Sequence, residues 1–530
     1  MLNDCRVRGR FGLPAYGIVP ALPGVALAAG LLAGCAGGTG GSADLPAPDR
    51  GVPADYAATP VADDRLATAD VDYAPDSGSL WWTVFDDPIL NRLVTGALPD
   101  NPDVMVARSR LREARALARQ DRAGLFPTFD FGATGEGRSN IGLDPTAPAD
   151  NTGLFDAGFD AAWEIDLFGR ARRSAEAADA GAQAAQARLA GVLVSLTAEV
   201  ATAYIDLRSA QATLAVVDES IDLQRHTRDL VHEQMVVGVA SPLDADRAEA
   251  ALLRLQAGRP SIRAEIDRAI NRLAVLSGRP PGTMNPTLAN PQPIPAASAA
   301  PDPGVPADLL RQRPDLRAAE QDIEQAAAGL DVAVADLYPR LSIPGSISIS
   351  ATGLGTGSIV QTVVSSLSAV LSVPLFDGGR RRAAVDAAEE QAHQALFTYR
   401  RTLLLALEEV ETALVEHREA SDRLDILERT LDTTARATNR ATARFQGGMA
   451  DFLEVLDAQR ERVEIARERA QARADAARAV VRLHKAIGGG VGWLEATPHA
   501  DAEIVGAADN AIVEPEDAGA VMQSGRHRPG

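Results

Sequence analysis

The sequence has 530 residues and a formal net charge of −20, with 46% apolar residues and only 4% aromatic residues. The length allows a large core or several domains. The strongly negative charge argues against a nucleic-acid partner, because nucleic acid is bound by a basic surface. An aromatic-poor sequence rich in Ala, Glu, Arg and Leu is typical of long helices in close contact.

The first 35 residues have the pattern of a targeting segment. A basic start is followed by an apolar run from Ile18 to Gly34 and then by Cys35. Leu32-Ala33-Gly34-Cys35 resembles the bacterial lipobox, in which the chain is cleaved before the cysteine and lipid is attached to it. We therefore predict a signal peptide at residues 1–34 and a lipidated Cys35. An ordinary signal peptide with a chance cysteine is the alternative.

The residues after the lipobox point to the outer membrane. Ala36-Gly37 follow Cys35 without an Asp, which by resemblance to the sorting rules of enteric bacteria favours the outer membrane. Cys5 would leave with the signal peptide, so the mature chain would hold one cysteine and no disulfide. Residues 35–79 are predicted to be the lipidated cysteine and a flexible tether. No later segment reaches the ~18 apolar residues of a spanning helix, so a further crossing requires a barrel.

Helices are predicted at about residues 88–98 and 102–124, followed by two strands at about 125–134 and 155–167. In both strands apolar and polar residues alternate, which places each set on its own face of a sheet. The second strand exceeds the 9–11 residues that a tilted membrane strand needs. Its polar face carries the four acids Asp156, Asp160, Glu164 and Asp166.

A long helix is predicted at about residues 169–236, because apolar residues recur every seven positions as in a coiled coil. At 1.5 Å per residue it would be roughly 100 Å long. Ser241-Pro242 has the residue types of an N-cap and a first helical position, and starts a second helix that runs to about Leu276. Residues 279–306 are rich in proline and are predicted to be a linker.

The same order then repeats. Leu337-Tyr338-Pro339 echoes Leu125-Phe126-Pro127, 212 residues earlier, and Leu375-Phe376 echoes Leu167-Phe168. Two strands and a helix at about 380–446 follow, and Leu453 echoes Leu243 at a spacing of 210 residues. We predict a tandem duplication, with a first repeat at 80–278 and a second at 307–494. The acidic tail at 495–530 is predicted to be disordered.

Two repeats supply four strands, which cannot close a barrel alone, and an open sheet edge is not tolerated in lipid. Three chains would give twelve strands, an even number with a polar interior. The fold is therefore predicted to be mainly α with membrane β: a trimeric 12-stranded β-barrel continuous with a long α-helical coiled-coil barrel in the periplasm.

With this organisation, the chain resembles the TolC/OprM family of outer-membrane efflux proteins, in its lipidated, NodT-like branch that works with resistance-nodulation-division pumps. The resemblance covers about residues 80–490 and depends on the order and duplication of several short segments. These are the lipobox, Trp81 to Pro88, Leu125-Phe126-Pro127, Trp163 to Arg170, Val237 to Asp244, Pro374 to Arg380, and Phe445 to Asp457.

The resemblance implies a homotrimeric export duct that conducts drugs or other small solutes passively. It also implies a periplasmic adaptor protein at the helix tips, an inner-membrane pump that supplies the energy, and no enzymatic chemistry, cofactor or metal. A protein-secretion duct of type I is an alternative in the same class. A lipid-tethered coiled-coil scaffold without a pore is an alternative from another class.

The resemblance places a periplasmic gate in the turn and helix around Phe445, Asp451, Glu454 and Asp457. Three copies of Glu454 and Asp457 would form acidic rings that bind cations. The alternative is an ordinary solvated helix face. The family archetype has an Arg where Ala450 stands and a Tyr where Phe445 stands, so the closed state must be held differently. Arg444 and Arg247 are expected to pair with Asp451 and Asp244 or to reach the adaptor.

Two turns resemble the tips that contact the adaptor, and helix-ending turns without a partner are the alternative. They are Val237, Gly238 and Val239 in the first repeat, and Gly447, Gly448 and Met449 in the second. Asp156, Asp160, Glu164 and Asp166 would face the barrel lumen if the apolar face of their strand contacts lipid. A water-soluble sheet with an acidic outer face is the alternative.

Overall fold

The computed structural model describes residue 57 and residues 80–140, 150–297, 313–353 and 359–489. The chain divides into two compact units, Met1–Pro46 and Ala47–Gly530. The first unit lies outside the described residues, as do Cys35, nearly all of the predicted tether and the predicted tail. Everything below concerns the second unit.

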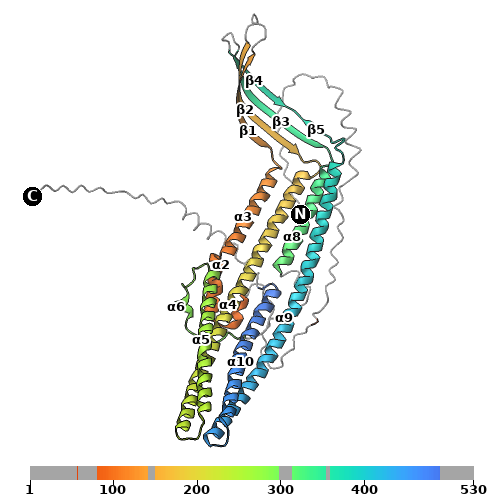
Figure 1. The fold of residues 1–530 in the computed structure, drawn as a ribbon. Helices are drawn as coiled ribbons and strands as arrows, with labels where there is room; N and C mark the ends of the chain where they lie inside the picture. Colours follow the sequence, from red (N-terminus) through yellow and green to blue (C-terminus); the bar gives the residue numbers. More distant parts are fainter. Residues whose placement is uncertain (1–56, 58–79, 141–149, 298–312, 354–358, 490–530) are drawn as a thin grey trace, which may run out of the picture. The chain divides into compact units, whose positions relative to one another are not determined.

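Figure 1 shows two successive runs of elements, and a helix, a strand pair, a long helix and a shorter helix recur in the same order in both. The first contains η1 (Trp81–Phe85), α2 (Pro88–Asp100), α3 (Pro102–Ala123), β1 (Thr128–Asn140), β2 (Asp150–Ile165), α4 (Arg170–Val236), α5 (Pro242–Leu276) and the short α6 (Asn285–Leu288). The second contains α8 (Pro314–Ala335), β3 (Arg340–Gly353), β4 (Ile359–Leu367), β5 (Val370–Ser372), α9 (Arg380–Gln446) and α10 (Phe452–Ala486).

The matching helices of the two runs have equal lengths. Helices α4 and α9 both have 67 residues, α5 and α10 both have 35, and α3 and α8 both have 22. The helices lie where the periodicity predicts them, and the tandem repeat is confirmed as the plan of the fold.

Helix α4 is held by the predicted seven-residue seam, because Leu193, Val200, Leu207 and Ile221 are all buried. The same apolar seam gives α4 an 18-residue window with a mean hydropathy of 1.4, long and apolar enough to cross a membrane. The expectation that no later segment would pass this test was therefore wrong. Since 56% of that window is buried inside the protein, it has the burial of a core helix.

The helix ends follow from local residue chemistry. Ser241 caps α5 in a capping box with Asp244, as the Ser-Pro start predicts. The ends of α5 and α10 are also fixed by the residues at the N-cap positions of α3 and α8. Asn101 Nδ2 donates to Leu276 O at 2.9 Å, and Arg313 Nη1 donates to Ala486 O at 2.7 Å. In each repeat, the start of the 22-residue helix is therefore hydrogen-bonded to the end of the 35-residue helix.

The strands form one antiparallel sheet in the order β1-β2-β3-β4, with β5 also pairing β3. The two repeats join at its centre, where β2 pairs β3 from Gly153↔Gly353 to Ile165↔Leu341. Among the strand residues whose side chains are described, none is buried. A sheet with apolar residues on one face and no packing layer needs another apolar environment to cover that face.

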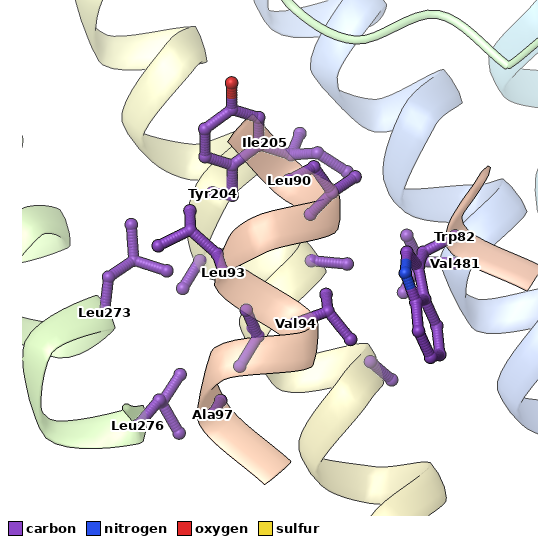
Figure 2. Packing of buried hydrophobic residues seen from close by; sticks show 14 of the residues in the cluster. Trp82, Leu90, Leu93, Val94, Ala97, Tyr204, Ile205, Leu273, Leu276 and Val481 are labelled. Atoms are coloured by element: carbon purple, nitrogen blue, oxygen red, sulfur yellow. The ribbon is translucent and has the colours of Figure 1, made fainter. Parts of the chain in front are cut away.

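The largest core lies where α2 and η1 pack against α4, α5 and α10. Figure 2 shows Leu90, Leu93 and Val94 of α2 projecting toward side chains of these neighbouring helices, among them Tyr204, Leu273 and Val481.

The first part of the predicted linker belongs to this core. Leu288 in α6 is fully buried, and its carbonyl accepts a hydrogen bond of 2.9 Å from Gln211 Nε2. Arg208 Nη1 donates to Asn290 O at 2.9 Å. The proline-rich composition indicated a linker but could not show that its apolar residues fill a gap in the core. Residues 298–312 lie outside the described residues.

Candidate functional site

The two predicted tips are the same turn built twice. After α4, Val239 N donates to Gln234 O at 2.8 Å and Gly238 N donates to Met235 O at 3.0 Å. After α9, Met449 N and Gly448 N make the equivalent bonds at 2.8 and 3.0 Å. This is the Schellman pattern that ends a helix, in which the residue after the helix takes a left-handed conformation. Gly238 has φ +78° and Gly448 has φ +66°, so glycine is required by the backbone.

The tips expose large apolar side chains. Val237, Val239 and Met449 are each about 70% exposed. Beneath them, a cluster that includes Val231, Ala248, Phe445 and Phe452 joins residues from α4, α5, α9 and α10. The two turns therefore share a packed base (Figure 1), while their outer apolar residues have no cover among the described residues. Apolar groups gathered at an exposed turn are typical of a protein-contact surface.

The four residues predicted to form the gate are three exposed acids, Asp451, Glu454 and Asp457, and one buried aromatic residue, Phe445. Glu454 and Asp457 are exposed on α10, whereas Val455 and Leu456 between them are buried. Phe445 is only 8% exposed and packs on Phe452, with ring centroids 5.6 Å apart. Phe445 is therefore part of the core beneath the turn.

Glu454 has a cation partner within the chain. Arg444 Nη1 lies 2.6 Å from Glu454 Oε1, and Arg444 Nη2 also contacts Met449 O at 3.4 Å. The expectation that Arg444 pairs with Asp451 was wrong, because α10 leaves the turn with Glu454 facing back toward α9. Asp451 occupies the N-cap position but makes no side-chain capping hydrogen bond. The expected pair of Arg247 with Asp244 is present at 3.7 Å.

Asp457 is paired more loosely than Glu454. Its Oδ1 lies 3.7 Å from Nη1 of Arg460, one turn further along α10, and both side chains are more than half exposed. Exposed ion pairs of this kind stabilise a protein by about 0–1 kcal/mol. Both acids are therefore available to other partners at little cost.

The predicted lumenal acids divide into two groups. Asp156 and Asp160 lie on the polar face of β2, opposite Ser350 and Ser346 in the β3 register. Asp160 also lies directly opposite Asp130 of β1, an acid that the sequence reasoning did not single out. Only the strand register could reveal it, because the two residues are 30 positions apart.

Glu164 and Asp166 accept hydrogen bonds from the first turn of α4. Arg170 donates to Glu164 at 3.0 Å, and this hydrogen bond raises the pKa of Arg170. Asp166 follows the last residue of β2 and accepts from Arg172 N at 3.0 Å. Asp166 is therefore off the strand, and its predicted place in the strand alternation was wrong. Among the described residues, no group of three or more His, Cys, Asp or Glu could hold a metal ion.

A model of the family described as "Outer membrane efflux protein" matches residues 93–279 and 305–489, one segment for each repeat. The chain belongs to the outer membrane efflux protein family.

Individual proteins with similar sequences support this family assignment. Nodulation protein T of Rhizobium leguminosarum bv. trifolii is 30% identical, covering 77% of this chain and 87% of that protein. The solvent efflux pump outer membrane protein SrpC of Pseudomonas putida is 31% identical, covering 77% and 86%.

Solved structures show the same fold. The outer-membrane channel OprN is 37% identical with a TM-score of 0.72, covering 78% of this chain and 93% of that one. VceC from Vibrio cholerae is 25% identical with a TM-score of 0.70, covering 78% and 100%. The predicted resemblance and fold class are confirmed. This efflux protein is an outer-membrane duct of an efflux system, and its family consists of channels rather than enzymes.

Proposed function

We propose that three copies of this efflux protein form a closed duct, anchored in the outer membrane by lipid on Cys35. In this proposal the duct passively conducts drugs or other small solutes from an inner-membrane pump of the resistance-nodulation-division type. The observation that carries the proposal is the antiparallel sheet β1-β2-β3-β4, with β5 beside β3, which has one apolar face and no buried residue among the strand residues whose side chains are described. Such a sheet is stable in lipid only when further chains close it.

The relatives favour a small-solute pump over protein secretion. SrpC is named for solvent efflux, and a second relative from Pseudomonas putida, 29% identical, is named for toluene efflux. A periplasmic adaptor would bind the tips through Val237, Val239 and Met449, whose exposed apolar side chains supply contact area. Gly238, Gly447 and Gly448 would let the adaptor backbone approach the turns closely. The duct itself would perform no chemistry.

We further propose that Glu454 and Asp457 form acidic rings at the periplasmic mouth, and that Asp156 and Asp160 line the lumen at the other end. Six carboxylates around one axis repel one another and attract cations. The Arg444–Glu454 pair holds the acid beside the turn, and because such an exposed pair is weak, Glu454 could exchange Arg444 for a cation. Phe445 would set the position of α10 behind this ring through its contact with Phe452, and Asp451 would stand at the first position of that helix, beside the mouth.

The duct is tested by purifying the full chain from outer-membrane fractions. We expect a trimer that dissociates on heating, incorporates labelled palmitate, and conducts ions in planar bilayers. A Cys35→Ser variant should lose the label. A stable monomer without conductance would overturn the proposal.

The gate is tested with the double variant Glu454→Gln, Asp457→Asn. Because the rings would lose their charge, they should bind cations more weakly. The concentration of a divalent cation that blocks half of the conductance should rise at least tenfold. Glu468→Gln is a matched control, since Glu468 is a carboxylate of the same helix, far from the turn and paired with Arg423 at 3.9 Å. Unchanged block in the double variant would refute the assignment.

A further inference from the structure

A groove lies over the middle of α4, between the two places where shorter helices meet end to end. Helices α3 and α8 both pack against α4 (Figure 1), and they begin beside the last turns of α5 and α10. Residues of both junctions line the groove, which has a volume of about 730 Å³. From α4 it is lined by Ala187, Gly191 and Ser195, which recur every four positions and share one helix face. Their small side chains leave the space above α4 open.

The chain leaves α10 at this groove. Gly488 lines it, and a Cβ placed on Gly489 would lie 3.4 Å from Cγ1 of Val194, another lining residue. Gly489 N donates to His484 O at 2.8 Å, and φ is +96° at Gly488 and +38° at Gly489. Such left-handed glycines end a helix and change the direction of the chain. Residues 490–494, Gly-Val-Gly-Trp-Leu, follow directly and lie outside the described residues.

The first repeat shows what the equivalent segment does. Residues 278–284 follow α5 as residues 488–494 follow α10, and both segments have glycine at their first and fifth positions. In the first repeat the segment returns to the helices, because Met284 is buried in the main core. At the spacing of 210 residues, Met284 corresponds to Leu494, which follows Trp493. The duplication therefore favours burial of the apolar residues after α10.

We propose that residues 490–494 fold back into the groove over α4, with Trp493 as the buried anchor. The four residues from Gly490 to Trp493 span at most about 14 Å, which suffices for a groove that the chain already enters at Gly488. The indole supplies a large apolar surface, and Ser195 in the lining offers an oxygen to its N–H. The docked segment joins α3, α4 and α8 at the level where α5 and α10 end. Because this docking occurs within one chain, it does not depend on the proposed trimer.

Charge at the groove supports the same occupant. Arg110 of α3 and Lys485 of α10 line the groove, and neither has an ion pair within the part of the chain that the structure describes. One lining acid, Asp103, also lacks an ion pair there, so the unpaired charge is net positive. The other charged lining residues are paired: Arg188 with Asp322, Glu199 with Arg272, and Arg313 with both Asp315 and Glu409.

The segment after α10 brings the complementary charge. Glu495 is the first charged residue after Gly489 and comes two positions after Trp493. With the indole in the groove, this carboxylate lies beside the basic groups of its rim. Exposed pairs of this kind contribute little free energy, so they orient the segment while the indole supplies most of the affinity.

Thiol labelling of the detergent-purified, full-length protein tests the docking. Gly191→Cys places a thiol in the groove, and the new Cβ has only Pro314 Cβ within 4 Å, at 3.8 Å. A bulky maleimide should label this thiol about tenfold faster or more when Trp493→Ala is added, because the anchor is lost. Gln183→Cys is the matched control, exposed on the same helix and about 12 Å away. It should label at the same rate with and without Trp493→Ala.

Two further variants separate loss of docking from loss of folding. Ala184→Cys, fully buried on the same helix, should stay protected in the Trp493→Ala background, which excludes general unfolding. Trp493→Phe keeps an aromatic anchor and should keep most of the protection of Gly191→Cys. Labels are counted on the peptide that holds the new cysteine, so Cys5 and Cys35 do not contribute.

The labelling rates decide between the occupants. If Gly191→Cys labels as fast as Gln183→Cys while Trp493 is present, nothing covers the groove and the proposal is overturned. If Gly191→Cys stays protected in the Trp493→Ala background, another occupant covers it, such as residues 298–312 or a partner protein, and the proposal is equally overturned. Neither result bears on whether the duct conducts.

Charge reversal gives a second measurement that leaves Trp493 in place. Arg110→Glu with Lys485→Glu should speed the labelling of Gly191→Cys a few-fold, because Glu495 would then be repelled. Adding Glu495→Arg should restore the slow rate, which a folding defect would not allow. Wild-type labelling in the double variant, or a failure of the rescue, would contradict the placement of Glu495.

Discussion

The buried histidine of α10 leads to a quantitative prediction. His484 is 3% exposed and stacks on Trp81, with ring centroids 5.1 Å apart and an interplanar angle of 26°. Its Nε2 is buried without a hydrogen-bond partner among the described residues. Burial in this apolar site lowers the pKa of His484 to about 4, from an ordinary value of 6.5.

This shift makes the stability depend on pH. Between pH 6.5 and 4 an unfolded histidine binds a proton, whereas the folded one does not, so the unfolded state holds more protons. The free energy of unfolding is therefore highest above pH 6.5 and falls as the pH drops toward 4, below which the loss levels off. At 1.36 kcal/mol for each unit of pKa, the full loss is about 3 kcal/mol.

The assay is denaturant unfolding of the detergent-solubilised protein, followed by tryptophan fluorescence at fixed protein concentration between pH 7.5 and 4. His484→Phe keeps an aromatic ring against Trp81 but cannot titrate, so its stability should change about 3 kcal/mol less over this range. His226→Gln, on the exposed side of α4, should behave as wild type. Burial also lowers the pKa of His417, and a His417→Gln variant measures how much His417 contributes to the pH dependence of stability. If wild type and His484→Phe lose the same stability between pH 6.5 and 4, the reasoning is refuted.

Three further predictions concern the helices. Ser241→Ala should lower the free energy of unfolding by about 1 kcal/mol, because the capping box with Asp244 is lost. Hydrogen exchange in the first turn of α5 should become faster, and unchanged exchange would contradict this prediction. Gly448→Ala should destabilise the second tip by about 1–2 kcal/mol through backbone strain alone, because φ is +66° and no atom lies within 4 Å of the added Cβ; proteolysis of the turn should increase, and wild-type resistance would argue against it. Leu207→Ala should lower the free energy of unfolding in denaturant by about 2–5 kcal/mol, because removing a fully buried side chain leaves a cavity. A loss below 1 kcal/mol would contradict this and indicate that neighbouring side chains fill the cavity.

Much of the fold could be predicted from local patterns. The seven-residue seam defines α4, the Ser241-Pro242 pair defines the start of α5, and the glycines at 238 and 448 define the tips. These features depend on residues within one or two turns of each other, so their physics is readable along the chain. The duplication was equally readable, because both copies kept their spacing.

The candidate site was readable only in part. Glu454 and Asp457 were found from their place after the second tip and are exposed, as a gate requires. The expected pairing of Arg444 with Asp451 was wrong, because whether Asp451 or Glu454 meets Arg444 depends on the angle at which α10 leaves the turn. Asp130 was missed because its proximity to Asp160 exists only in the strand register.

By itself, the sequence determined the type, order and length of the elements, since these follow from periodicity, caps and turn residues. Only the tertiary structure decided which side chains meet across elements. In the tertiary structure Phe445 lies in a core, and Glu164 and Asp166 bind the start of α4. Phe126 and Phe376 are exposed at opposite edges of the sheet. The physical reason is that such contacts depend on the register and direction of segments far apart in the chain, and alternating or heptad patterns are unchanged by a slip of one full period.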